Sequence, residues 1–228
     1  IARKRGLLVP ETFYPESIEE LEKIQETLSF PLVVKPRHSR FYDEEKRKIE
    51  AREPQIVSNR DELGTAFSKL HLGSSFPCVQ KWVKGSGAGV ELLIQKGEPL
   101  AVFCHGRIRE MSPLGSGSSA SRSIPLRKDL VEASLTLLKY CDYEGVAMVE
   151  FRREAEEGPF WFLEVNPRFW GSLALPLACG VNFPYLYLES FVRGERVFGG
   201  NSSYPVGIQM RSLWKETSRL IQVLKGRP

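Results

Sequence analysis

The chain has 228 residues, of which 42% are hydrophobic and 11% aromatic, enough to bury a substantial core in one or two compact domains. This composition excludes intrinsic disorder, which requires low hydrophobicity together with a high net charge. The formal charge of +4 at pH 7 suits an anionic ligand such as a nucleotide, but it is too small and too dispersed for a nucleic-acid-binding surface.

The first part of the chain alternates helix and strand patterns. The sequence Ser17-Ile-Glu-Glu20 is a capping box, and it opens a helix whose apolar residues recur at helical spacing. The β-rich run 32–36 predicts a strand. The charged segment 37–54 lacks periodicity and predicts a long loop, a feature that is usually functional or disordered.

The middle of the chain is richer in strand patterns. A short strand at 55–57 precedes a second helix, which has Ser58 or Asn59 as its N-cap. Further strands are predicted at 78–83, 90–96 and 100–110, the last two forming an antiparallel hairpin. The Gly/Ser-rich segment 111–123 predicts a mobile loop that could close over a site, with a plain flexible connector as the alternative.

The last part predicts a second hairpin between helices. The expected elements are a helix at about 127–141, strands at 144–152 and 160–165, helices at about 170–179 and 184–193, and a final strand and helix.

The hairpin places carboxylates in an apolar environment. A turn centred near Glu157 would set Glu150 directly across from Glu164, and alternation along the strand puts Glu164 and Asn166 on one face. Two like charges opposed across a ladder are destabilising unless a cation lies between them. Mg²⁺, which prefers oxygen ligands, would meet this need, with Mn²⁺ as a substitute.

An alternative needs no metal. In it, Glu150 pairs with Arg152 or Arg168 at the edge of the sheet. Arg168 also suits a second role, because its guanidinium follows Asn166 closely and can bind phosphate in a bidentate manner. Two carboxylates with an amide favour the metal–phosphate interpretation.

The segment EGVAMVEFRR…FWFLEVNPRFWGS resembles the metal-binding hairpin of the ATP-grasp superfamily, in the style of carbamoyl-phosphate synthase and the carboxylate–amine ligases. The strand LVVKP and the segment VQKWVKG are similar to the family's phosphate-lysine strand and hinge strand. The resemblance implies an α+β ATP-grasp fold, in which two lobes, each an antiparallel sheet with flanking helices, hold ATP between them. It implies a smaller lobe at 1–84, a larger lobe at 85–200 and a strand–helix tail at 201–228.

The resemblance also implies the nucleotide ligands. Lys35 corresponds to the phosphate lysine, and the hinge segment contributes Gln80, Lys81, Trp82 and Val83, the last through an adenine hydrogen bond to its backbone. Where many members have a ribose-binding glutamate, Glu91 is the only nearby acid. In place of a glycine-rich phosphate loop the chain has segment 37–54, where Arg37, His38 and Arg40 could substitute.

The substrate side is marked by alternating basic residues. His105, Arg107 and Arg109 occupy alternate strand positions and should share a face. We expect Arg107 or Arg109 to contact phosphate or a carboxylate substrate, with a solvated strand face as the alternative. By the resemblance, Arg168 stabilises charge on the transferring phosphoryl group, while Lys35 and Lys81 hold phosphates.

The resemblance implies an ATP- and Mg²⁺-dependent ligase. It would convert a small-molecule carboxylate into an acyl phosphate, which an amine or similar nucleophile then attacks. The alternatives are a phosphotransferase using the same site and a non-catalytic nucleotide-binding module. We expect no nucleic-acid partner, and either a homodimer or contact with an N-terminal domain absent from this chain.

A cytoplasmic protein without membrane contact is expected. The longest apolar runs are strand-length, far short of the roughly 20 residues of a membrane span. The four cysteines lie apart in apolar surroundings, as buried thiols of a reducing compartment do. Because the chain begins with Ile rather than Met, we expect it to be a segment of a longer polypeptide.

Overall fold

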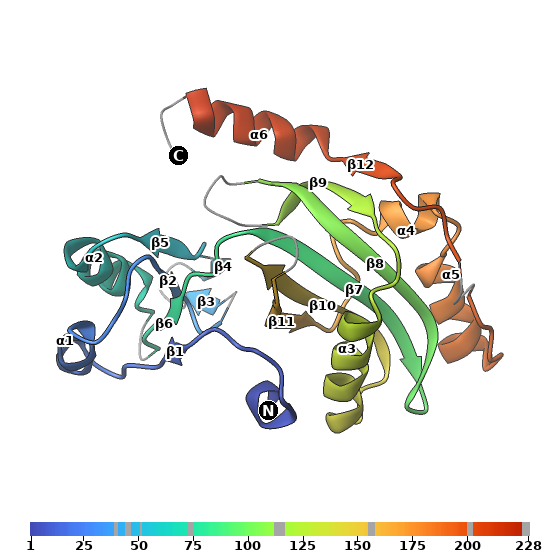
Figure 1. Cartoon of the computed structure of the whole chain (residues 1–228), viewed down its shortest axis with the longest axis horizontal. Coiled ribbons are helices and arrows are strands. Elements are labelled where there is room, and N and C mark those ends of the chain that lie inside the picture. Colours follow the sequence, from blue (N-terminus) through green and yellow to red (C-terminus); the bar gives the residue numbers. More distant parts are fainter. Residues whose placement is uncertain are drawn as a thin grey trace. The chain divides into compact units, whose positions relative to one another are not determined.

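The structure is a computed structural model, shown in Figure 1. It describes residues 1–38, 41–43, 47–50, 52–72, 75–111, 117–154, 158–199 and 203–224. The chain divides into two compact units, one formed by Pro10–Val83 and the other by Ile1–Val9 together with Lys84–Pro228. Each unit contains an antiparallel sheet with helices, so the predicted α+β architecture is confirmed.

The unit Pro10–Val83 is built on a four-stranded sheet. Its order is β1-β6-β2-β5, and every neighbouring pair is antiparallel. The strands are β1 (Thr12–Phe13), β2 (Leu32–Lys35), β5 (Gln55–Val57) and β6 (Cys78–Lys81). Helices α1 (Ile18–Gln25) and α2 (Arg60–Leu70) pack their apolar residues against one side of this sheet.

Both helices begin where the sequence predicts. The Ser17 side chain accepts a hydrogen bond from the Glu20 N–H, and the Asn59 side chain accepts one from the Glu62 N–H. These caps satisfy N–H groups that have no partner inside the helix. The N-terminal boundaries of α1 and α2 are therefore local properties of the sequence.

The segment 37–54 differs from the prediction of a loop. Strands β3 (Phe41–Asp43) and β4 (Lys48–Glu50) form a two-stranded antiparallel sheet within it. Arg37 is anchored by hydrogen bonds from Nη2 to the carbonyl oxygens of Tyr14 and Pro15. Arg40, expected to substitute for part of a phosphate loop, lies outside the described residues.

The larger unit is built on a six-stranded antiparallel sheet in the order β11-β10-β7-β8-β9-β12 (Figure 1). The strands are β7 (Ser86–Gln95), β8 (Glu98–Glu110), β9 (Ser118–Ser123), β10 (Gly145–Arg153), β11 (Phe160–Asn166) and β12 (Gln209–Arg211). The turn predicted near Glu157 falls outside the described residues, but the two strands that it joins pair as expected.

Two strands extend into segments that the sequence does not mark as strands. β7 begins at Ser86 instead of 90, and β9 occupies the end of the predicted 111–123 loop. The sequences SGAG and SSASRS contain none of the β-branched and aromatic residues that are enriched in strands, so neither segment is recognisable as a strand from the sequence. Their backbones are held by pairing with neighbours, β7 with β8 and β10, and β9 with β8 and β12.

Apolar residues cover the two faces of this sheet differently. One face packs against α3 (Lys128–Tyr140) along most of its length. The other face is apolar only at one end, where it meets α4 (Ala174–Ala178), α5 (Phe183–Tyr187) and the π-helix η2 (Leu188–Arg193). The remainder of that second face carries charged side chains.

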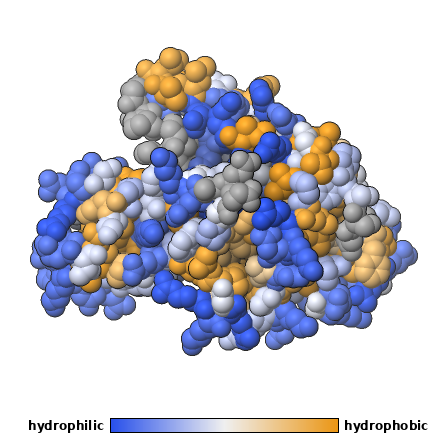
Figure 2. All heavy atoms as spheres, viewed as in Figure 1, coloured by the Kyte–Doolittle hydropathy of each residue, from blue (hydrophilic) through white to orange (hydrophobic). Residues whose placement is uncertain are grey.

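The short 3₁₀ helix η1 (Ala2–Arg5) contacts α3, and helix α6 (Leu213–Leu224) contacts β9. Helix α6 leaves much of its apolar surface exposed, with Trp214 82% accessible, and Figure 2 shows hydrophobic side chains gathered there. Within the described part of the chain, no helix combines the length and apolarity needed to cross a membrane.

Candidate active site

One row of directly paired residues crosses four strands of the larger sheet. Glu164 on β11 pairs with Glu150 on β10, Glu150 pairs with Gly89 on β7, and Gly89 pairs with His105 on β8. Directly paired residues point to the same face, so these side chains line one surface. The predicted juxtaposition of Glu150 and Glu164 is confirmed by this register.

A bulge sets the position of the two carboxylates. Glu150 pairs with Glu164 but Phe151 pairs with Phe162, which leaves Leu163 as an extra residue on β11. Such bulges re-aim the side chains that follow them. Here the bulge keeps Glu164 opposite Glu150 even though the inner part of the hairpin has a different register.

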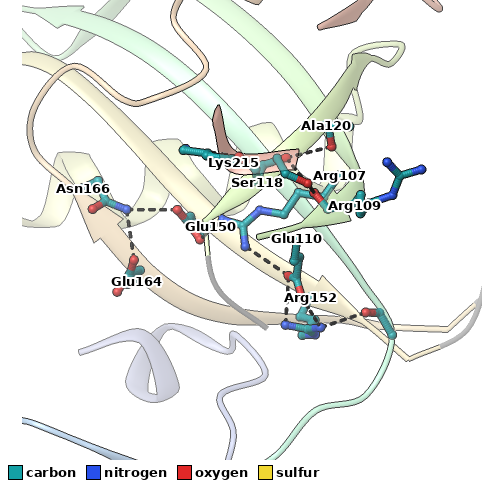
Figure 3. A network of polar contacts seen from close by, with 12 residues as sticks. Arg107, Arg109, Glu110, Ser118, Ala120, Glu150, Arg152, Glu164, Asn166 and Lys215 are labelled. Atoms are coloured by element: carbon teal, nitrogen blue, oxygen red, sulfur yellow. Dashed lines mark hydrogen bonds and ion pairs between the residues drawn. The ribbon is translucent and has the colours of Figure 1, made fainter. Parts of the chain in front are cut away.

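Asn166 holds the two carboxylates together. Its Nδ2 donates hydrogen bonds to Glu150 Oε1 at 3.2 Å and to Glu164 Oε1 at 3.1 Å, as Figure 3 shows. Its Oδ1 accepts a hydrogen bond from Arg168 Nη2 at 3.1 Å. The four residues predicted as the metal and phosphate set are therefore brought together.

The positive charge beside Glu150 comes from Arg107, and not from Arg152 or Arg168, the two partners that the alternative without a metal offered. Arg107 Nη2 lies 2.5 Å from Glu150 Oε2, and Arg107 Nη1 lies 3.2 Å from Glu110 Oε1. Arg152 binds Glu110 through contacts of 3.0 and 3.2 Å, so its guanidinium is directed to Glu110 and not to Glu150 (Figure 3). Burial disfavours the charge on Arg107, but Glu150 and Glu110 outweigh it and raise the pKa of Arg107.

The donor set suits a hard divalent cation. Glu150 and Glu164 offer carboxylate oxygens and Asn166 an amide oxygen, while no group of three or more His, Cys, Asp or Glu side chains arranged to hold a metal ion occurs among the described residues. Mg²⁺ is commonly held by one or two carboxylates, with water and phosphate oxygens completing its coordination. The Asn166 amide presents Nδ2 to the carboxylates, so rotating it by half a turn would present its oxygen.

Glu91 requires a correction. It was expected to bind ribose, but its side chain is fully buried, and its Oε1 lies 2.5 Å from Nδ1 of His105, which is 2% exposed. Burial raises the pKa of Glu91, and the neighbouring His105 partly opposes that shift. A fully buried carboxyl cannot reach a ligand hydroxyl, so Glu91 is not available to bind ribose.

Arg109 also departs from the expected pattern. Arg107 pairs with Ser121 while Arg109 pairs with Ala120, so a bulge interrupts the alternation between them. Arg109 binds Glu216 on α6, whereas Arg107 contacts Glu150 and Glu110. The three basic residues of β8 therefore have separate partners: a buried glutamate, the carboxylate row and the C-terminal helix.

The nucleotide residues predicted in the smaller unit divide between two faces of its sheet. Lys35 pairs with Cys78 and Gln80 pairs with Val33, so Lys35 and Gln80 share one face. Lys81 pairs with Leu32, whose side chain belongs to the core packed against α1 and α2. Lys35 and Lys81 thus project from opposite faces, and the expectation that both bind the same phosphates does not fit the register.

The remaining hinge residues are partly engaged. Gln80 Nε2 donates to Thr12 Oγ1 at 2.8 Å, and the Trp82 N–H donates to the Pro31 carbonyl at 3.3 Å. The Val83 side chain is buried, which leaves only its backbone for the predicted adenine contact. These positions remain predictions.

Glu110 is the main residue that sequence reasoning missed. It joins Arg107 and Arg152 in one network, and Arg152 also donates to the Gly85 carbonyl at 3.1 Å. In a regular strand, residues three apart point to opposite faces, so spacing gives no sign that Glu110 meets Arg107. The bulges between Arg107 and Glu110 create that contact.

Known proteins share this architecture. A family model described as "ATP-grasp in the biosynthetic pathway with Ter operon" matches residues 79–216. A putative urea carboxylase of Emericella nidulans is 28% identical over 207 residues, covering 84% of this chain and 16% of that protein.

Solved structures agree with the fold. An L-amino acid ligase from Bacillus licheniformis has a TM-score of 0.62 at 22% identity, covering 82% of this chain and 44% of that one. The ADP complex of N5-carboxyaminoimidazole ribonucleotide synthetase (purK) has a TM-score of 0.73 at 16% identity, covering 99% and 58%. The chain thus spans less than two thirds of each of these proteins.

Proposed function

Because the chain belongs to the ATP-grasp family, we propose that it is the ATP-binding part of an ATP- and Mg²⁺-dependent ligase. In this proposal a carboxylate is activated as an acyl phosphate, and an amine or similar nucleophile displaces the phosphate. The observation that carries it is the convergence of Glu150, Glu164 and Asn166 on one surface, with Arg168 bound to Asn166.

The metal residues have defined roles in this proposal. Glu150, Glu164 and Asn166 would hold Mg²⁺, which supplies charge neutralisation to the phosphate oxygens when bound. Arg168 is exposed and already contacts the Asn166 oxygen, so its guanidinium can stabilise charge on the transferring phosphoryl group. These residues act by placing positive charge where negative charge develops.

On the nucleotide side, we assign Lys35 to phosphate and the Val83 backbone to adenine. The assignment of Lys35 is supported by its position on the sheet face opposite the helix-packed core and by partial exposure of its side chain. Gln80 and Trp82 are kept as neighbours of the nucleotide. In this proposal residues 10–83 form the smaller lobe and residues 84–200 the larger lobe; residues 1–9, expected in the smaller lobe, cluster with the larger unit, as does the tail 201–228.

On the substrate side, Arg109 is a better candidate than Arg107 for contact with a carboxylate substrate. The Arg109 side chain is 41% exposed, whereas that of Arg107 is 11% exposed and lies between two carboxylates. An exposed guanidinium can exchange a protein carboxylate for a ligand carboxylate without leaving a buried charge unpaired.

The test compares Glu164→Gln with wild type. Loss of a residue that hydrogen-bonds to a metal ligand costs about 10- to 100-fold, so loss of a direct ligand should lower Mg²⁺-dependent ADP release by more than about 100-fold. ADP release would be measured against a panel of carboxylates with and without amines. Thermal shift with Mg²⁺ and a non-hydrolysable ATP analogue would report binding separately from turnover.

Glu132→Gln is the matched control, because Glu132 is an exposed carboxylate on α3. Full ADP release by Glu164→Gln would contradict the proposal. Release that depends on a hydroxyl compound and never on an amine would favour the phosphotransferase instead.

A further inference from the structure

Two glycines interrupt the charged face of β7. Gly87 and Gly89 occupy the alternate positions that precede Glu91 on this face, and both are buried. A Cβ atom built on Gly87 would lie 2.6 Å from Arg107 Cδ, and one on Gly89 would lie 2.3 Å from His105 Cε1. Side chains from the neighbouring strand therefore occupy the space above both glycines.

This space lets Arg107 cross a whole strand. Arg107 lies on β8 and Glu150 on β10, with β7 between them. Neighbouring strands are about 4.8 Å apart, so a side chain on β8 reaches β10 only by lying flat across β7. A side chain at Gly87 would obstruct that path. Because glycine has none, Arg107 Nη2 reaches Glu150 Oε2 at 2.5 Å (Figure 3).

The charge balance explains what this contact does. Glu150 and Glu164 face each other directly, an arrangement that is destabilising unless a positive charge is close by. Arg107 supplies that charge from the β7 side, and Glu110, itself bound to Arg152, holds the guanidinium in place. The guanidinium and a divalent cation would both be attracted to the Glu150 carboxylate.

We propose that Arg107 is the built-in counter-ion of Glu150, that a divalent cation competes with it for this carboxylate, and that Gly87 is the positioning residue that opens its path. The inference rests on the proposed metal site and deepens it. It makes cation affinity a property set in part by β7 and β8, two strands that contribute no metal ligand of their own.

The test is a titration of the chain with MnCl₂ in the absence of nucleotide, followed by electron paramagnetic resonance of free Mn²⁺. Arg107→Met keeps an apolar stem and removes the charge. A neighbouring charge commonly shifts such equilibria by one or more pK units, so Arg107→Met should bind Mn²⁺ roughly tenfold more tightly than wild type. Gly87→Ala keeps the charge but displaces the side chain, and it should tighten binding roughly threefold on the same grounds.

Gly106→Ala is the matched control, because its Cβ would lie next to Ile124 Cγ2 at 3.3 Å, on the other face of β8. It should leave Mn²⁺ affinity unchanged. Equal or weaker Mn²⁺ binding by both Arg107→Met and Gly87→Ala overturns the inference.

The background Glu164→Gln separates this inference from the proposed function. If Glu164→Gln abolishes Mn²⁺ binding but Arg107→Met leaves it unchanged, the metal site is supported and the proposed competition between Arg107 and the cation is refuted. Mn²⁺ binding that is insensitive to Glu164→Gln in every background refutes the metal site itself, and the counter-ion inference with it.

Discussion

Two acidic sites on one sheet face have opposite surroundings. Glu150 and Glu164 lie at the β10–β11 side, where Glu164 is exposed and Arg107 balances the charge. Glu91 lies on β7, fully buried, with His105 as its partner. The register relates the sites closely, because Met148 pairs with both Glu91 and Asn166.

The difference between the sites follows from what covers each of them. Glu91 adjoins the apolar cluster that packs against α4 and α5, so its carboxyl is removed from water together with that core. The Glu150–Glu164 pair lies beyond this cluster. A carboxylate near solvent can exchange partners for a cation, whereas a sealed carboxyl retains one partner and contributes to the fold.

The largest effect on stability should come from breaking the buried Glu91–His105 pair. His105→Leu leaves Glu91 buried without its partner, and in the described part of the chain Glu91 Oε2 already has no hydrogen bond. Removing one member of a buried pair costs about 3–5 kcal/mol, to be measured by urea unfolding. The double variant with Glu91→Leu should recover most of the loss, and failure to recover would show that the pair is not the cause.

The loss of stability in the His105→Leu variant should depend on pH. Burial raises the pKa of Glu91 in the folded chain, and loss of His105 removes an opposing influence, so the pKa rises further. The folded state then binds more protons than the unfolded state, and stability falls as pH rises above the usual glutamate pKa of about 4.3. His105→Leu should therefore be less destabilising at pH 5 than at pH 8, and a reversed trend would contradict the burial argument.

A smaller effect is expected where α6 meets the sheet. Glu216 binds Arg109, while Lys215 donates to the Ser118 carbonyl at 3.2 Å and Arg219 donates to the Glu110 carbonyl at 2.8 Å. Because the Arg109–Glu216 pair is partly exposed, Glu216→Ala should cost at most about 1 kcal/mol in urea unfolding. A larger loss of unfolding free energy would mean that the Arg109–Glu216 pair behaves like the buried Glu91–His105 pair and not like the exposed Glu164 carboxylate.

The smallest effect on stability is predicted for Glu164→Gln. Its carboxylate is exposed and faces the like charge of Glu150, so the unfolding free energy should stay within about 0.5 kcal/mol of wild type. Urea unfolding at low salt without metal would measure it. Destabilisation comparable to that of His105→Leu would remove the contrast between the two sites.

The sequence alone determined much of the smaller unit and of the β10–β11 hairpin. Capping by Ser17 and Asn59 fixed two helix starts, because these hydrogen bonds reach only three residues along the chain. Glu150 and Glu164 lie on strands joined by one turn, which made their pairing predictable, although the register next to the turn would place Leu163 opposite Glu150 and the bulge is needed to bring Glu164 there. Local interactions of this kind leave a pattern in the sequence.

Only the tertiary structure decided the partners of those residues. Arg107 meets Glu150 across β7 because Gly87 has no side chain, and it meets Glu110 because bulges in β8 break the alternation. Glu91 is sealed because apolar residues from α4 and α5 pack over the adjoining part of its face. Each of these contacts joins strands or helices that are distant in sequence. The contact therefore depends on how those elements are registered and buried against one another, and the spacing of nearby residues encodes neither the register nor the burial.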